Sequence, residues 1–107
     1  MTSKQWKYSS RMLNGAVRVI DGCEKDDHIS WTSLGIWTIN PGLVKCYENE
    51  LLRTGTFSLS VDMKTIIYGG YDAQYNVHDD IVELTENKLV LTNTSAEGDW
   101  KITYIPY

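Results

Sequence analysis

The residues best suited to chemistry in this chain are two short acidic segments, each containing one of its two histidines. Asp26-Asp27-His28 and His78-Asp79-Asp80 are near mirror images, and carboxylate oxygens and imidazole nitrogens are ligands of divalent ions. In an extended strand, the first and third residues of each segment share one face and the central aspartate points to the other. Because this splits the ligands, the pattern favours solvated strand ends on an acidic surface, and we expect neither segment to bind a metal.

The chain has two cysteines, Cys23 and Cys46, and they flank a predicted β-hairpin. In an oxidising compartment, a disulfide that closes a loop of this length stabilises a fold by about 3 kcal/mol. The alternative is a pair of buried, reduced thiols. No Cys-x-x-Cys spacing or flanking base in the sequence favours a redox role.

Motifs of catalysis are missing from the sequence. It contains no Gly-x-Ser-x-Gly, no phosphate-binding glycine loop and no thiol beside an evident base. Spacing alone also brings no two carboxylates together. We therefore predict a protein that is not an enzyme and that uses no cofactor.

Aromatic residues form the remaining candidate site, because they fall on separate predicted strands. Strand alternation can direct most of them to one side of the sheet, where they would line the interior of a barrel. Such a lining offers apolar area and almost no charge, and it predicts modest, promiscuous binding of a small apolar or amphipathic molecule. The alternative is a packed core without a cavity. The candidate ligand-binding residues are Trp6, Trp31, Trp37, Phe57, Tyr68, Trp100 and Tyr104.

Short alternating segments must position these side chains, since helical periodicity is almost absent. Between two of the segments, Gly35 can supply a positive φ for a tight hairpin. Residues 12–22 are compatible with an extended piece, a helical turn or a loop. Because closure removes exposed sheet edges, we predict an all-β, eight-stranded antiparallel up-and-down barrel. Its strands are predicted at 4–11, 27–32, 35–40, 53–61, 65–68, 80–85, 88–93 and 99–105, with less regular segments at 43–52 and 71–77.

Composition places the chain among folded globular domains. Its 107 residues, 42% of them hydrophobic and 22% charged, predict a single domain spanning 1–107. The formal net charge is −4, and lysines and arginines are scattered, so nucleic acid is not an expected partner. No apolar run approaches the ~20 residues that a membrane-spanning helix needs.

Several spaced patterns resemble the short lipocalin-like domain of secreted and surface-anchored Bacteroidetes proteins. The resemblance runs over roughly residues 4–106. Gln5-Trp6 is similar to the first-strand tryptophan that plugs one end of lipocalin barrels. Cys23 with Asp26-Asp27 is similar to the family's cysteine and acidic pair, and Cys46 is similar to its partner cysteine. Gly55-Thr56-Phe57 is similar to the family's Gly-x-aromatic strand, and Tyr104-Ile105-Pro106 is similar to its closing Tyr-x-Pro.

The resemblance implies a lipocalin-like barrel with a Cys23–Cys46 disulfide. It also implies a secreted, periplasmic or cell-surface protein whose export signal is not present in these residues and whose only membrane contact is a lipoprotein anchor. The expected function is to hold a small hydrophobic or amphipathic ligand without catalysis. The alternative is a cell-surface structural or protein-interaction module with a filled core.

Overall fold

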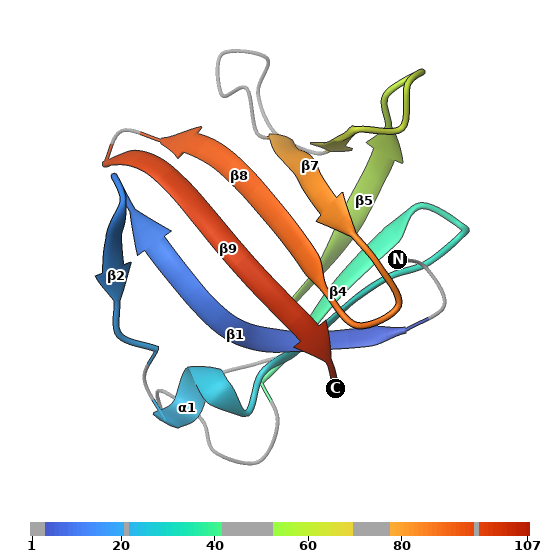
Figure 1. Cartoon of the computed structure of the whole chain (residues 1–107). Coiled ribbons are helices and arrows are strands. Elements are labelled where there is room, and N and C mark those ends of the chain that lie inside the picture. The colour runs from blue at the N-terminus through green and yellow to red at the C-terminus, as the bar shows by residue number, and fades with distance from the viewer. Residues whose placement is uncertain (1–3, 21, 42–52, 70–77, 96) are drawn as a thin grey trace.

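The computed structural model describes residues 4–20, 22–41, 53–69, 78–95 and 97–107. Within these residues the chain forms antiparallel strands and one single-turn helix, α1 (Gly22–Lys25) (Figure 1). The strands are β1 (Gln5–Leu13), β2 (Ala16–Arg18), β3 (His28–Trp31), β4 (Ile36–Asn40), β5 (Arg53–Leu59), β6 (Thr65–Tyr68), β7 (His78–Leu84), β8 (Leu89–Ser95) and β9 (Gly98–Pro106).

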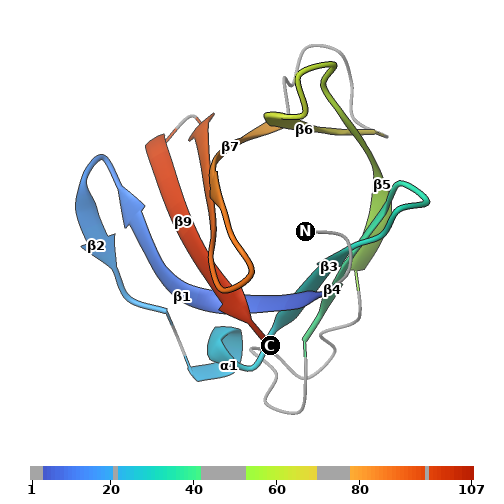
Figure 2. The same ribbon diagram turned by 45° about the vertical axis from the view of Figure 1, so that its right-hand side comes forward.

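Eight of the strands close into a barrel. They pair in the order β1-β3-β4-β5-β6-β7-β8-β9, and β9 returns to pair with β1 from Trp6↔Pro106 to Leu13↔Trp100. Figure 2 shows the ring, with β1 at the bottom, β5 on the right and β6 and β7 at the top. Closure gives the first and last strands a hydrogen-bonding partner. The predicted eight-stranded up-and-down barrel is therefore confirmed.

Each predicted strand coincides with an observed one, give or take a few residues at the ends. The β3–β4 hairpin turns at Gly35 with a φ of 81°, as its sequence predicts. The segments 43–52 and 71–77 lie outside the described residues. Register shifts in β1, between Tyr8 and Ser10, and in β7, between Ile81 and Glu83, are β-bulges, which bend strands and assist closure.

The ninth strand, β2, lies in the segment that the sequence left undecided. Asn14 and Gly15 take φ values of 51° and 81° and turn β1 back into β2. An Asn-Gly pair between extended segments is a strong hairpin signal, because both residues tolerate positive φ. β3 pairs with the start of β1, at Gln5 and Trp6, and β2 pairs with its far end. The extra strand thus extends the sheet where β1 runs beyond β3.

Helix α1 is tied to β1 by an ion pair. Both guanidinium Nη atoms of Arg11 donate to the carboxylate of Glu24, at 2.6 and 2.8 Å, and Nη2 also donates to the carbonyl of Val19 at 3.0 Å. Two-pronged contacts of this kind add geometric specificity to the charge attraction. They hold the connection between β2 and β3 against the barrel wall beside β1 (Figure 1).

The core occupies the inside of the barrel. Strand alternation produces this core, because residues two apart on each strand point inward together. Burying each large apolar side chain contributes about 1.5–3 kcal/mol. The fully buried members are Trp6, Ile66, Leu89 and Leu91, and around them pack Ile29, Trp31 and Tyr104.

Candidate functional site: an aromatic cavity in the barrel

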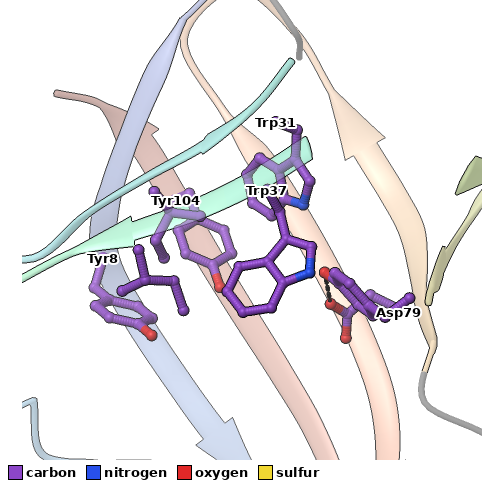
Figure 3. A pocket seen from close by; sticks show the side chains of 8 residues that line it. Tyr8, Trp31, Trp37, Asp79 and Tyr104 are labelled. Atoms are coloured by element: carbon purple, nitrogen blue, oxygen red, sulfur yellow. Dashed lines mark hydrogen bonds between the residues drawn. The ribbon is translucent and has the colours of Figure 1, made fainter. Parts of the chain in front are cut away.

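A cavity of about 190 Å³ lies among the inward-facing side chains. Ile29, Trp31 and Tyr104 are almost completely buried, whereas the other lining residues are half-buried. Six different strands contribute, so closure of the barrel is what brings these side chains together (Figure 3). The lining residues are Tyr8, Ile29, Trp31, Trp37, Ile39, Tyr68, Asp79 and Tyr104.

The aromatic rings of the cavity pack against one another in defined geometries. Tyr8 and Tyr104 are stacked with their centroids 5.3 Å apart. Trp31 meets Tyr104 edge-on at 5.9 Å, and Trp37 meets Tyr68 edge-on at 6.2 Å. Pairs of this type contribute about 0.5–1.5 kcal/mol beyond their buried area. The cavity walls therefore hold their shape through mutual ring contacts.

Trp37 reaches its position because the facing residue on β5 has no side chain. Gly55 lies opposite Trp37 in the β4–β5 register. A Cβ built on Gly55 would lie 2.6 Å from the indole Nε1 and 2.7 Å from two ring carbons. A glycine at this position thus lets the indole lie close against the β5 backbone.

Asp79 brings a carboxylate into this aromatic surrounding. It lies opposite the fully buried Ile66 in the β6–β7 register and therefore points into the barrel. The hydroxyl of Tyr68 donates to one of its oxygens at 2.6 Å, and the side-chain amide of Asn93 donates to the other at 2.7 Å. The expectation of an interior with almost no charge is therefore corrected: one acidic side chain lines the cavity.

Two indole N–H groups at the cavity lack a hydrogen-bond partner among the described residues. They belong to Trp31, whose side chain is 2% exposed, and to Trp37. A buried donor without an acceptor costs about 1–3 kcal/mol. A ligand that carries an acceptor oxygen would relieve this cost.

Two tyrosines of the cavity, Tyr8 and Tyr104, have raised pKa values. Burial is the main cause that raises the pKa of Tyr104 well above its usual value, and Tyr8 and Asp79 add to it. Burial also raises the pKa of Tyr8, followed by the negative charges of Asp27 and Glu24. The hydroxyls of Tyr8 and Tyr104 are therefore neutral donors and acceptors near neutral pH.

The cavity contains four of the seven predicted ligand-binding residues: Trp31, Trp37, Tyr68 and Tyr104. Trp6 is instead fully buried in the packed core. Phe57 and Trp100 line two other hollows, beside Gly35 and beside Lys101 respectively.

Sequence reasoning did not include Tyr8, Ile29, Ile39 and Asp79 in the site, although strand alternation could have found them. Tyr8 is two residues from Trp6 on β1, and Asp79 is two residues from Ile81 on β7. Both therefore share a face with a core side chain. For Asp79, charge outweighed alternation in the prediction.

The first acidic histidine segment connects α1 to the start of β3, whereas the second begins β7, and the described residues contain no group of three or more potential metal ligands. In the first segment, Asp27 is buried, whereas His28 shares a hydrogen bond of 2.8 Å with Gln5 and stacks on Tyr107 at 4.2 Å. Cys23 lies in α1, and Cys46 lies outside the described residues, so the disulfide stays a prediction.

Comparison with known proteins supports the fold and leaves the activity open. No protein-family model matches the chain, and no curated protein does either. A solved structure, that of an uncharacterised protein from Bacteroides eggerthii, is similar, with a TM-score of 0.60 and 14% sequence identity over 97% of this chain and 98% of that one. None of the described helical residues forms a helix with the length and apolarity to cross a bilayer. The chain thus shares a barrel fold with a Bacteroides protein, and a lipocalin family assignment does not follow.

Proposed function

We propose that this protein is a non-enzymatic binding protein that holds one small hydrophobic or amphipathic molecule in the aromatic cavity of its barrel. The observation that carries the proposal is the pair of indole N–H groups of Trp31 and Trp37, which have no acceptor among the described residues and lie beside an aromatic hollow. Ligand pockets are mainly apolar with a few polar groups that fix orientation. The preferred molecule has an apolar body and one acceptor oxygen.

Cavity size limits what can be enclosed. An apolar cavity of about 150 Å³ holds one benzene molecule, and pockets for drug-sized ligands begin at about 300 Å³. At about 190 Å³, the cavity encloses a ring or a compact branched group. A fatty acyl chain would have to extend beyond it.

Export is part of the proposal and is supported by the two cysteines and by the family resemblance. A protein made in an oxidising compartment can close the loop between Cys23 and Cys46. Secretion, a periplasmic location or a cell-surface location all meet this condition. An Ellman titration of the unfolded protein tests the disulfide on which this support depends.

Binding can be tested with cyclohexanol, a neutral ring-sized alcohol that does not absorb where tryptophan does. The indole N–H resonances of the four tryptophans report separately in a ¹H–¹⁵N correlation spectrum. We expect saturable shifts for Trp31 and Trp37 and unchanged signals for Trp6 and Trp100, which lie outside the cavity. Affinity should be modest and should fall in Trp37→Ala, a variant that removes one wall.

A filled-core interaction module is the second candidate, and the packing around Trp6 favours it. Trp6, Ile66, Leu89 and Leu91 leave no exposed surface inside their part of the barrel. This candidate predicts that cyclohexanol moves no indole signal, or that Trp37→Ala binds it better because truncation opens a void. Either result would replace the ligand-binding proposal.

A further inference from the structure

The carboxylate of Asp79 lines the cavity, and none of the described lining residues is a cation that would neutralise it. Its two hydrogen bonds come from neutral donors, Tyr68 and Asn93. The ion pairs Arg11–Glu24 and Lys88–Glu83 do not involve Asp79, and the described residues that line the cavity include no lysine, arginine or histidine. The two hydrogen bonds leave acceptor capacity on the carboxylate, which has about four lone-pair sites. A cation of the ligand can therefore bind it directly.

Aromatic faces surround the same space and also attract cations. Tyr8, Trp31, Trp37 and Tyr104 converge from four strands with Asp79 at the side of the cavity (Figure 3). The π-face of each ring carries partial negative charge, and tryptophan is the strongest cation–π partner. The negative charge of Asp79 also acts on Tyr104, two strands away on β9, where it is one cause of the raised pKa after burial and Tyr8. The cavity thus has a negative electrostatic potential as well as an apolar lining.

We propose that the ligand of this cavity is a small organic cation, an alkylammonium or quaternary ammonium compound whose charged group lies between Asp79 and the aromatic rings. The inference rests on the proposed function, because it requires that the cavity opens to a ligand at all. An acceptor oxygen on the same molecule would pair with the indole N–H groups of Trp31 and Trp37. Amino alcohols and betaines have this combination in a compact volume.

Choline and 3,3-dimethyl-1-butanol test the charge directly, because they have the same shape and differ in a quaternary nitrogen against a quaternary carbon. Both are titrated into the protein while the indole resonances of Trp31 and Trp37 are followed. We expect choline to bind at least about tenfold more tightly than the neutral isostere, the ratio that one well-placed cation–π contact supplies. Equal affinities, or tighter binding of the alcohol, would overturn the proposal.

Asp79→Asn removes the charge and keeps the side-chain shape. We expect this variant to bind choline no better than the isostere. The matched control is Asp80→Asn, the same change on the next residue, whose side chain is exposed on the outer face and bonded to Thr65 at 3.0 Å. Because it alters net charge equally without touching the cavity, it should keep the preference for choline. If both variants lose the preference equally, a long-range field explains it and the proposed site is wrong.

The outcomes separate this proposal from the broader one. Binding of cyclohexanol without a preference for choline leaves the binding function standing and refutes the cation. Failure of every probe refutes both. Should Asp79→Asn not fold, the comparison of choline with its isostere on the unmodified protein still decides the question.

Discussion

Replacing Gly55 by alanine should displace the indole of Trp37 and alter the cavity. The added Cβ would lie 2.6 Å from the indole Nε1, whereas ordinary contacts begin at 3.4 Å. The ring must therefore move by about 0.8 Å, because both β4 and β5 are paired on each side and cannot spread easily. The edge-on contact of Trp37 with Tyr68 would be disturbed at the same time.

Two opposing effects determine the size of the stability change. Overpacking a core costs about 1–3 kcal/mol, whereas alanine in a strand gains about 0.5–1 kcal/mol over glycine through backbone entropy. The cost of the clash is the larger effect, so the free energy of unfolding should fall by about 1.3 kcal/mol. For a chain of 107 residues the unfolding entropy is about 0.22 kcal/mol/K, so the Tm should fall by about 6 °C.

Thermal unfolding and tryptophan fluorescence of Gly55→Ala measure these effects, and cyclohexanol titration measures the consequence for binding. We expect a lower Tm, a shifted emission maximum and weaker binding. Gly22→Ala is the matched control, because a Cβ at Gly22 meets no atom within 4 Å. The reasoning is refuted if Gly55→Ala melts like the unmodified protein, or if Gly22→Ala loses as much stability.

Four further predictions concern the rest of the barrel. The pKa of Tyr104 is raised in the folded state, chiefly by burial and then by Tyr8 and Asp79. As the pH rises, the Tyr104 hydroxyl therefore loses its proton at a lower pH in the unfolded chain than in the folded one. Stability should then fall above pH 10 by about 1.4 kcal/mol per pH unit for this one group, and phenolate absorbance should show fewer tyrosines titrating before unfolding than after it. Asn14→Ala should lower the free energy of unfolding, measured with denaturant, by about 1–2 kcal/mol. Alanine tolerates a φ of 51° less well than asparagine, and it cannot accept the hydrogen bond that the backbone N–H of Asp99 donates to Asn14 at 2.9 Å. Asn14→Gly, which keeps this φ accessible, should lose less stability. Protein made under oxidising conditions should show no free thiol in an Ellman titration after unfolding, and two free thiols would contradict the Cys23–Cys46 bond. Zinc or calcium at about millimolar concentration should leave the Tm unchanged, since only a ligand of the folded state raises it; a rise of many degrees would contradict the absence of a metal site.

Local patterns in the sequence determined the fold class and most of its strands. The alternation of Phe57 and Leu59 with polar residues, and the hairpin at Gly35, depend on neighbours a few positions away, so they can be recognised without the fold. Eight such segments in consecutive order leave two exposed edges, and closure is the physical solution. The Asn14–Gly15 turn is also encoded in the sequence, but the Val17-Arg18-Val19-Ile20 run that follows it is compatible with a strand, a helical turn or a loop.

Only the tertiary structure decided which inward-facing side chains share a cavity. Alternation tells that Trp6, Trp31 and Trp100 can face the interior, but it does not tell at which height of the barrel each lies. That height depends on strand register and on the bulges in β1 and β7, which shift pairing by a residue. The register places Trp6 in the packed core and Trp31 at the cavity.

The role of Asp79 was likewise decided by long-range pairing. In the sequence, Asp79 is one of the four aspartates that flank the two histidines, and Glu83 follows shortly after it. Acidic residues grouped in this way normally lie in solvent. In the barrel, pairing with β6 and β8 turns it inward, where Tyr68 and Asn93, 11 and 14 residues away, donate to its oxygens. A charge inside the barrel is tolerated only where such donors converge, and their convergence is a property of the closed sheet.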